Sequence, residues 1–308
     1  MKAFEQYAKS RKVVVVGDVM LDRYWSGHSD RKATEKPIPI VFVDRIDDYL
    51  GGAGSVAINA AALGMDVHLV GCVGKDLAGR KVKTLCRQSS VQWLGVSESQ
   101  TIVKTRTMLD GQLIMRADQD YDLSGQDTVL FEHSKPQIAN ADVLIIADYN
   151  KGTIGAANPW VKWAKDNDCL VFVDTKRSDW SEYHGVSMIK PNHHELMAVM
   201  QQSNLPKARQ MIQALKQQLS IEYIWLTMAE DGMEWWGDDV IAMPSIVRHA
   251  VDATGAGDAA MAVMSALWGY PNMSQQARLK WASLASAAAV TRARNVPISW
   301  ADIKILVT

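Results

Sequence analysis

The sequence lacks the features that identify exported, membrane-bound and disulfide-stabilised proteins. No apolar run approaches the roughly 20 residues that a membrane-spanning helix requires, and the N-terminal stretch MKAFEQYAKSRK is too polar for an export signal. The three cysteines, Cys72, Cys86 and Cys169, are scattered and lack the paired spacing of a disulfide framework or a zinc site. We therefore expect a cytoplasmic protein that does not associate with a membrane.

An excess of charge of either sign is also absent. The 33 lysine and arginine residues nearly balance the 34 aspartate and glutamate residues. A chain with this balance offers no extended basic surface for nucleic acid. We expect its partners to be small molecules and not nucleic acid.

Two widespread site motifs are missing as well. The first apolar run, VVVVGDVMLD, lacks the G-x-G-x-x-G turn of a Rossmann dehydrogenase. The sequence contains no HExxH motif, and the adjacent His193 and His194 cannot share one face of a helix, which favours solvated histidines over a zinc site.

What the sequence does contain is an alternation of buried strands and helical segments. Continuous apolar runs, typical of strands buried on both faces of a parallel sheet, occur at residues 13–18, 67–74, 143–149, 170–176 and 223–228. The stretches between them have helical periodicity, and 48% of all residues are hydrophobic. This pattern predicts an α/β fold with a mostly parallel central sheet and helices on both of its faces.

Polar residues gather where the predicted strands end, which is where ligands bind to such sheets. They are Asp18, Asp22, Asp148, Asp174 and Lys176, together with the KPNHHE turn at 190–195. We expect the binding cleft at this edge of the sheet.

Two segments depart from the alternation and predict a small β-sheet outside the main one. One is PIPIVFVDRI at 37–46, and the other is the pair 101–109 and 112–118, joined by Asp110-Gly111, which is a strong hairpin signal. We expect lid strands within about 30–46 and 100–119 that cover the cleft, an ordinary surface hairpin being the alternative. Because exposed edge strands tend to pair, two lids are expected to meet in a homodimer.

The stretch VDATGAGDAAMA, residues 251–262, places Gly255, Ala256 and Gly257 directly before Asp258 at the start of an apolar helical segment. Glycines here let backbone amides converge at a helix start, where unpaired N–H groups and the helix dipole attract an anion. The stretch therefore predicts an anion cradle that could hold a phosphate while Asp258 accepts a proton. The alternative is an ordinary helix start whose aspartate complements the helix dipole.

Two further stretches fit a phosphoryl-transfer site. GGAGSVAINAA, residues 51–61, is a glycine-rich turn into a helix and lets a ligand approach the backbone closely. In PNHHE, Asn192 and Glu195 lie three residues apart on one face of a starting helix, where their oxygens could hold Mg²⁺ directly or through water.

Together these stretches resemble the ribokinase-like, or PfkB, family of carbohydrate kinases. DATGAGD, residues 252–258, resembles the C-terminal signature of that family, and GGAGSVA, residues 51–57, resembles its N-terminal signature. The spacing between the two agrees with the family, and the resemblance extends over essentially the whole chain. It implies a single ribokinase-like kinase domain over residues 1–308 that uses ATP and Mg²⁺.

The resemblance also implies roles for individual residues. Asp258 would act as the catalytic base, and the amides of the cradle would hold the transferring phosphoryl group. The residues that would bind the sugar are Asp18, Asp22, Gly51, Gly52, Ser55 and Asp148. The residues that would serve the nucleotide and Mg²⁺ are Asn192, Glu195, Thr227, Gly232 and Thr254.

Within the family, several stretches resemble the kinases that phosphorylate D-glycero-D-manno-heptose 7-phosphate at its anomeric hydroxyl, on the way to ADP-heptose for lipopolysaccharide. They are GDVMLDRYWSG (17–27), RKATEKPIP (31–39), TIVKTR (101–106), ADYNKG (147–152), DTKR (174–177) and PNHHE (191–195). A substrate that already carries a phosphate needs cations at the sugar end of the cleft. The candidates are Arg31, Lys104, Arg106, Arg116 and Lys176, each of which alone is equally well explained as a solvated surface charge.

Other functions stay open. Ser55 stands where the first signature normally has an asparagine that contacts the sugar, and DTKR replaces the more usual Asp-Pro-Lys-Gly, so a PfkB-type kinase for another sugar or nucleoside is an alternative. A sugar- or nucleotide-binding regulator without turnover is a second alternative, which the intact Asp258 and cradle glycines oppose. Because no H-x-G-H stretch occurs before Thr308, we expect any later nucleotidyl transfer to belong to another protein.

Overall fold

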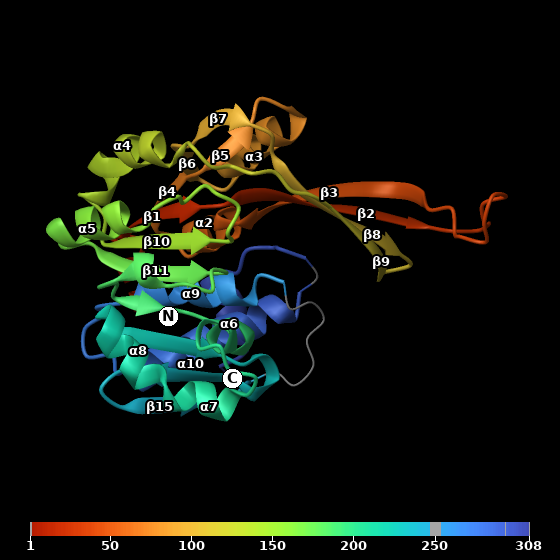
Figure 1. Cartoon of the computed structure of the whole chain (residues 1–308). Coiled ribbons are helices and arrows are strands. Elements are labelled where there is room, and N and C mark those ends of the chain that lie inside the picture. The colour runs from red at the N-terminus through yellow and green to blue at the C-terminus, as the bar shows by residue number, and fades with distance from the viewer. Residues whose placement is uncertain (1, 247–253, 293, 308) are drawn as a thin grey trace.

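A nine-stranded sheet forms the body of the molecule (Figure 1), in a computed structural model that describes residues 2–246, 254–292 and 294–307. The strand order is β15-β14-β13-β12-β11-β10-β1-β4-β6, parallel from β13 to β6 and antiparallel at β14 and β15. The strands are β1 (Lys12–Gly17), β4 (Asp66–Val70), β6 (Val91–Trp93), β10 (Val143–Asp148), β11 (Leu170–Thr175), β12 (Met188–Ile189), β13 (Tyr223–Thr227), β14 (Met233–Trp236) and β15 (Val240–Met243).

A second, four-stranded sheet projects from this body as a long arm, which we call the lid (Figure 1). In the order β3-β2-β8-β9, its strands are β2 (Val19–His28), β3 (Phe42–Gly52), β8 (Ile102–Leu109) and β9 (Gln112–Gln119). Only Asp18 separates the end of β1 from the start of β2, so the chain passes directly from the central sheet into the lid. A short parallel pair, β5 (Cys72–Gly74) and β7 (Val96–Ser99), forms a third sheet.

Helices cover both faces of the central sheet, and alternating strand side chains enter two separate cores. In β1, Val13 and Val15 belong to one core and Val14 and Val16 to the other, as the period-two geometry of a strand requires. The first core is closed by α1 (Lys2–Ala8), α2 (Ala53–Ala62), α3 (Leu77–Gln88), α9 (Ala256–Leu267), α10 (Gln275–Val290) and α11 (Trp300–Ile305). The second is closed by α4 (Asp127–Ile138), α5 (Asn158–Asp166), α6 (His193–Val199), α7 (Leu205–Gln210) and α8 (Ile212–Leu219). Two 3₁₀ turns, Ser181–Tyr183 and Ala229–Asp231, complete the described elements.

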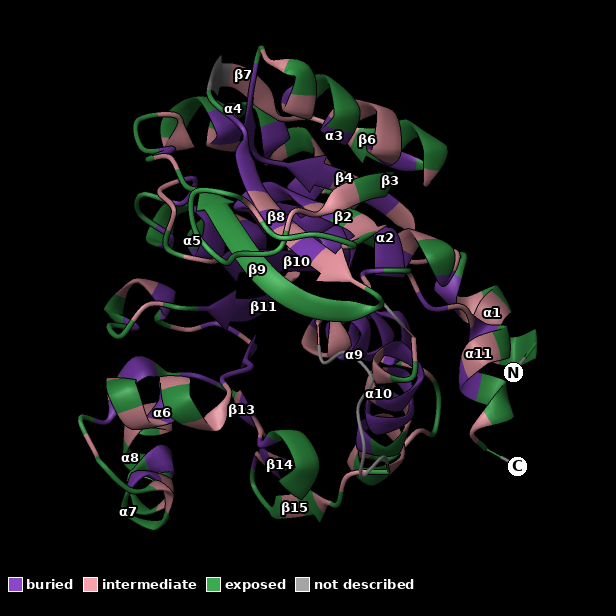
Figure 2. Cartoon of the chain, turned by 90° about the vertical axis from the view of Figure 1, so that its right-hand side faces the viewer, coloured by how far each residue is buried: buried purple, intermediate pink, exposed green. Residues whose placement is uncertain are grey.

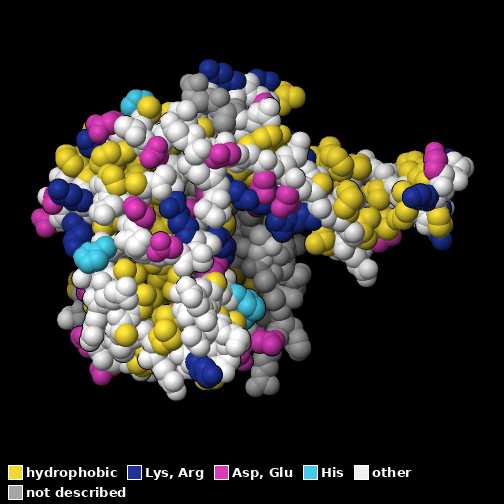
Figure 3. Space-filling view, in the orientation of Figure 1, with side chains coloured by type: hydrophobic (Ala, Val, Ile, Leu, Met, Phe, Trp, Pro, Cys, Tyr) yellow, Lys and Arg dark blue, Asp and Glu magenta, His cyan; other side chains and the backbone are white. Residues whose placement is uncertain are grey.

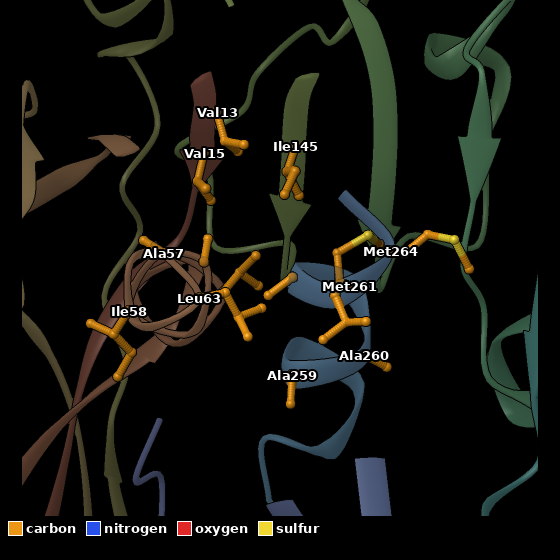
Figure 4. Packing of buried hydrophobic residues seen from close by; sticks show 14 of the residues in the cluster. Val13, Val15, Ala57, Ile58, Leu63, Ile145, Ala259, Ala260, Met261 and Met264 are labelled. Carbon is orange, nitrogen blue, oxygen red and sulfur yellow. The ribbon is translucent and has the colours of Figure 1, made fainter. Parts of the chain in front are cut away.

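Small side chains place α9 at the centre of the first core. Its sequence, AGDAAMAVMSAL, is rich in alanine, and its residues from Asp258 to Leu267 are all buried. Ala259, Ala260, Met261 and Met264 lie beside residues of β1, β10 and α2 (Figure 4). Because small residues permit close approach, α9 packs against both α2 and α10. This packing fixes the position of its first turn.

The structure confirms the α/β prediction and the predicted hairpin. Asp110 and Gly111 have φ values of 48° and 83°, and positive φ at both residues is what a tight two-residue hairpin turn requires. No helix in the described ranges combines the length and the hydropathy that crossing a bilayer demands.

Strand positions differ from the prediction at three places. The lid strand expected at 37–46 runs instead from Phe42 to Gly52. The segment 67–74 forms two strands, β4 and β5, because the chain leaves the central sheet near Gly71. The sequence pattern did not indicate β2 as a lid strand, since its buried first half reads as a continuation of β1.

Gly17 offers a test of the close pairing between β1 and β10. A Cβ atom on Gly17 would lie 1.9 Å from the carbonyl oxygen of Ala147, and φ at Gly17 is +155°. We expect Gly17→Ala to lower the free energy of unfolding by about 3 kcal/mol or more, because backbone must move to relieve the overlap. The matched control is Gly111→Ala, at a positive-φ glycine with open space around it, which should cost about 1 kcal/mol. Urea unfolding measures both, and equal losses would contradict the packing.

Candidate functional site

A cavity of about 900 Å³ lies between the lid and the carboxyl ends of the central strands. The lid contributes charged side chains from β2, β8 and β9 to its wall, and the body contributes the ends of β10, β11, β12 and β13 together with the start of α9. The sequence-predicted residues on this wall are Asp22, Gly52, Lys104, Arg106, Arg116, Lys176, Asn192, Glu195, Thr227, Gly232, Thr254, Gly255, Ala256, Gly257 and Asp258. The cleft therefore lies at the predicted edge of the sheet.

The start of α9 has the geometry of an anion cradle. Gly255 is the N-cap residue with φ of 81°, a conformation that favours glycine, and a Cβ atom there would lie 2.8 Å from Asn295 Oδ1. A Cβ atom on Gly257 would lie 3.1 Å from Lys190 Nζ. The missing side chains thus leave the first amides of α9 open toward the cavity, where the helix dipole favours an anion. Residues 251–253 of the predicted stretch lie outside the described part of the chain.

Asp258 lies in the first turn of α9 and is almost completely buried, with 9% of its surface exposed. The hydroxyl of Tyr149 donates a hydrogen bond of 3.3 Å to Asp258 Oδ1. Burial raises the pKa of Asp258 to about 6, and the charge of Asp174 adds to this, while Ser55, Lys190 and Tyr149 act in the opposite direction. Burial also raises the pKa of Tyr149 far above its ordinary value, which keeps that hydroxyl protonated as a donor.

An ion pair faces the cradle from the strand ends. Lys190 follows β12, Asp174 lies near the end of β11, and Lys190 Nζ is 2.8 Å from Asp174 Oδ2. Burial alone would lower the pKa of Lys190, but the neighbouring carboxylate of Asp174 outweighs it and the pKa is raised. The ammonium therefore stays charged inside the wall of the cleft.

At the lid end of the cleft, Asp22 is held by two donors. Arg106 Nη1 lies 2.6 Å from Asp22 Oδ1, and Asn295 Nδ2 lies 2.7 Å from Asp22 Oδ2. Gly51 makes room for this carboxylate, since a Cβ atom there would lie 2.4 Å from Asp22 Oδ2. Asp22 is thus fixed in place as an acceptor for hydroxyl groups at the cavity wall.

Three predicted cations converge on the cleft face of the lid. Lys104 and Arg106 are two residues apart on β8 and therefore point to the same face of the lid. Arg116 on β9 lies directly opposite Arg106, so its side chain is on that face as well. Asp118 accepts hydrogen bonds from Arg116, and its Oδ2 atom forms an ion pair with Lys104 Nζ at 3.0 Å. A fourth cation, Lys151, joins them through Asp120 at 2.7 Å. We call these four residues, Lys104, Arg106, Arg116 and Lys151, the lid cation cluster.

Two predicted cations lie elsewhere. Arg31 is exposed, stacks on the ring of Phe42 at 5.4 Å and does not line the cavity. Lys176 lines the cavity on the opposite wall, where it forms a close ion pair with Glu195 and lies 5.8 Å from the ring centre of Tyr149. Strand periodicity could not exclude Arg31, which lies in the loop between β2 and β3 at the far end of the lid (Figure 1).

Four residues expected to bind the sugar, Asp18, Gly51, Ser55 and Asp148, do not line the cavity. The carboxylate of Asp18 accepts hydrogen bonds from the backbone N–H groups of 149, 151 and 153, and Asp18 is fully buried. Asp148, also fully buried, accepts a 2.6 Å hydrogen bond from Tyr183 and pairs with Arg177 at 2.7 Å. Ser55 is 1% exposed, below the cradle. In these contacts the two carboxylates organise backbone and neighbouring side chains.

Asn192 and Glu195 form a capping box at the start of α6. The side chain of Asn192 accepts from the amide of Glu195, whose carboxylate accepts from the backbone amide of Asn192 at 2.8 Å. Both line the cavity, but within the described ranges no three acidic, histidine or cysteine side chains converge as a metal-binding group. The carboxylate of Glu195 also pairs with Lys176, so both of its oxygens already have partners within the protein.

Sequence reasoning missed several residues of the wall. Tyr149 directly follows a buried strand, a position that could have indicated it, whereas Lys190 belongs to the KPNHHE turn expected at the cleft but was given no role. Lys151 lies in the quoted stretch ADYNKG but carries no periodicity signal. Asn295 lies 273 residues from its partner Asp22, and no local pattern connects them.

Comparison with known proteins gives the chain a family. The model of the pfkB family carbohydrate kinases matches residues 10–298. The protein named bifunctional protein HldE from Shewanella denitrificans is 35% identical over 288 residues, which cover 90% of this chain and 59% of that protein. Bifunctional protein HldE from Hydrogenovibrio crunogenus is 33% identical, over 95% of this chain and 62% of its own length. The chain thus spans about three fifths of the curated relatives it matches.

Solved structures share the fold. Ribokinase from Arabidopsis thaliana, in complex with ribose and ATP, matches with a TM-score of 0.74 and 18% identity over 96% of this chain and 98% of its own. Phosphofructokinase-2 from Escherichia coli, in complex with potassium, matches with a TM-score of 0.78 and 15% identity over 96% and 97%. The solved structures thus share the ribokinase-like fold, and the match of the family model over residues 10–298 shows that this chain belongs to the pfkB family of carbohydrate kinases, enzymes that transfer a phosphoryl group to an alcohol acceptor.

Proposed function

We propose that this kinase uses ATP to phosphorylate D-glycero-D-manno-heptose 7-phosphate at its anomeric hydroxyl. The observation that carries the proposal is the lid cation cluster, which lies at the end of the cleft next to Asp22. A guanidinium group binds phosphate through parallel hydrogen bonds, so arginines at the sugar end favour a sugar that already carries a phosphate. Burial tends to lower the pKa of Arg106, but its pairing with Asp22 prevails and the pKa is raised.

Sequence likeness supports the same substrate. The stretches from GDVMLDRYWSG to PNHHE resemble heptose 7-phosphate kinases, and the relatives that match at about 35% identity bear the name HldE. The product would then be heptose 1,7-bisphosphate, a precursor for ADP-heptose and lipopolysaccharide.

The nucleotide would occupy the opposite half of the cleft. The residues that we assign to it are Asn192, Glu195, Thr227, Gly232 and Thr254, all of which line the cavity. The Arabidopsis ribokinase of the same fold was solved with ATP, which supports ATP as the donor. Mg²⁺ bound with the nucleotide would neutralise phosphate charge, and Glu195 would hold it through water.

Asp258 would act as the base. It accepts the proton of the attacking hydroxyl, while the amides of Ala256, Gly257 and Asp258 hold the transferring group. Its carboxylate is a weak base, but in a loose phosphoryl-transfer transition state positioning and charge stabilisation supply most of the acceleration. Asp22 would orient the sugar by accepting hydrogen bonds from its hydroxyls.

The substrate is tested by measuring Mg²⁺·ATP turnover with heptose 7-phosphate beside fructose, ribose, adenosine and fructose 6-phosphate. We expect the heptose phosphate to give the highest kcat/KM and phosphorus NMR to show a new anomeric phosphate. The matched control is the same heptose without its phosphate, which should have a much higher KM because the lid cation cluster loses its ligand. Preference for adenosine or an unphosphorylated sugar would favour a kinase of different specificity, and Ser55 would then be the first residue to exchange.

Replacement of Asp258 separates its chemistry from its structural role. We expect Asp258→Asn to lower kcat by about 10²- to 10⁴-fold, the loss typical of a missing general base. The folded pKa is raised from 3.8 to about 6, so the folded chain binds the proton more tightly and stability falls as pH rises through this window. Ionisation of Asp258 at pH 7 therefore lowers the free energy of unfolding by at most about 3 kcal/mol. Because asparagine carries no charge, the variant should melt at a higher temperature.

The pH profile gives the matching readout. Wild-type kcat/KM should fall below pH 6 as Asp258 is protonated, and the residual activity of the asparagine variant should lack this fall. A variant with near-wild-type turnover would overturn the assignment.

We also propose that two copies pair through the lid. The exposed apolar side chains of this arm are Trp25, Ile38, Val43, Ile46, Leu113, Ile114 and Met115. Figure 3 shows hydrophobic side chains along the arm, and Figure 2 shows β9 exposed over its whole length. An apolar sheet with open edges favours association with a second copy.

Sedimentation measures this association. We expect the double variant Ile46→Asp/Leu113→Asp to shift the chain from dimer to monomer, because buried charges at an apolar interface are unfavourable. The control is Leu77→Asp, at a side chain that is 77% exposed on α3, which should leave the dimer intact. A wild-type chain that sediments as a monomer at micromolar concentration would contradict the proposal.

A further inference from the structure

The wall of the cleft contains a buried lysine, Lys190, to which the proposed roles of Asp258, Asp22 and Glu195 assign no function. Lys190 is 5% exposed and Asp174, its partner at 2.8 Å, is 7% exposed. Both side chains line the cavity, one from the turn before α6 and the other from the end of β11. The pair therefore belongs to the wall of the cleft and not to either hydrophobic core.

Stability does not explain this pair. Removing two charges from water costs several kcal/mol per ion, and replacing a buried ion pair by apolar residues is often neutral or stabilising. The preceding residues Val173 and Ile189 point to the opposite side of the sheet and enter its second hydrophobic core, so strand alternation turns Asp174 and Lys190 toward the cavity. A charged pair at the cavity wall is consistent with use by a ligand.

The ammonium group lies beside the first turn of α9. A Cβ atom on Gly257 would be 3.1 Å from Lys190 Nζ, so only the absence of a side chain at Gly257 leaves the space between the amides and the ammonium open. The next residue in the chain is Asp258. Lys190 Nζ is thus adjacent to the place where the cradle would hold an anion.

Lys190 also retains unused donors. An ammonium carries three N–H groups, and within the described ranges its Nζ is paired with Asp174 alone. Three carboxylates act on its charge: Asp174 of β11, Glu195 of α6 and Asp258 of α9. The remaining donors can therefore reach an anion in the cavity without breaking the pair with Asp174.

We propose that Lys190 is a catalytic residue that donates hydrogen bonds to the phosphoryl group while it is transferred, and that Asp174 is the positioning residue that holds the ammonium in place. In this step the bond from phosphorus to the leaving oxygen of ADP breaks and the bond to the sugar oxygen forms. The hydroxyl proton goes to Asp258, and Lys190 keeps its own proton throughout. A fixed cation at the point where charge is redistributed stabilises the transition state more than the ground state.

The inference rests on phosphoryl transfer, which family membership shows, and not on which sugar is the acceptor. Its test therefore uses whichever acceptor the wild-type chain phosphorylates. If heptose 7-phosphate fails as substrate but another sugar is turned over, the proposed specificity falls while the role of Lys190 can still be measured.

Lys190→Met removes the charge and keeps the length of the side chain. We expect kcat to fall by about 10²- to 10³-fold, as when a transition-state donor is lost, with KM for ATP changing less than about fivefold. Binding of Mg²⁺·ADP with aluminium fluoride and the acceptor, a mimic of the transferring group, should weaken far more than binding of Mg²⁺·ADP. The control is Lys83→Met, at a half-buried lysine of α3 that donates to Ser97 outside the cleft, which should retain wild-type kinetics.

A second variant separates catalysis from folding. Lys190→Met alone leaves Asp174 buried and unpaired, so the double variant Lys190→Met/Asp174→Asn removes both charges and should recover the melting temperature while kcat stays low. Lys190→Arg should recover part of kcat, because a cation is restored. Recovery of kcat in the double variant, or equal weakening of the two ADP complexes, would show that the lysine acts only structurally or only in ground-state binding.

Discussion

The carboxylate of Asp18 connects the parts of this protein on which the site depends. It lies at the single residue between the central sheet and the lid, and it accepts backbone hydrogen bonds from residues 149, 151 and 153 after β10. Burial raises the pKa of Asp18 although these bonds act to lower it. The loop that it fixes places Tyr149 against Asp258 and Lys151 against Asp120. One buried carboxylate thus sets the position of groups at both ends of the cleft.

The two ends of the cleft carry opposite charges that the surrounding protein must compensate. At the start of α9, Asp258 and Asp174 are carboxylates withdrawn from water, and Lys190 with the helix dipole offsets their charge. Burial raises the pKa of Asp258 to about 6, which brings a carboxylate closer to the proton affinity that a general base needs near neutral pH. The desolvation that makes the charged form of this residue unfavourable for stability would also suit the role of base that we propose for it.

At the lid, cations are the groups that need compensation. Asp118 and Asp120 partner the lid cation cluster, and the neighbouring guanidinium of Arg116 lowers the pKa of Asp118 strongly. These carboxylates keep the cluster in place before a ligand arrives. The substrate phosphate that we propose for this end would replace carboxylates as the partner of these cations. Its binding free energy would therefore depend on hydrogen-bond geometry more than on charge alone.

The sequence by itself determined the fold class, the hairpin at Asp110-Gly111 and the carboxyl edge of the sheet as the place of the cleft. These follow from local rules, since strand periodicity, turn chemistry and the direction of parallel strands are all encoded within short segments. The GAGD stretch was sufficient to indicate a cradle beside a carboxylate. Lys104, Arg106 and Arg116 were predicted from their position in the lid strands, and alternation along β8 and β9 puts them on one face.

Only the tertiary structure decided which polar residues face the cavity. Asp18, Asp148 and Asp174 all lie at strand ends, yet Asp18 and Asp148 turn beneath the cleft and bind backbone or buried side chains. Asn295 reaches Asp22 across 273 residues, and Lys190 meets Gly257 only because β12 and α9 come together in the fold. Such contacts depend on how helices pack against the sheet, and that packing is the sum of many weak, non-local interactions that no short segment encodes.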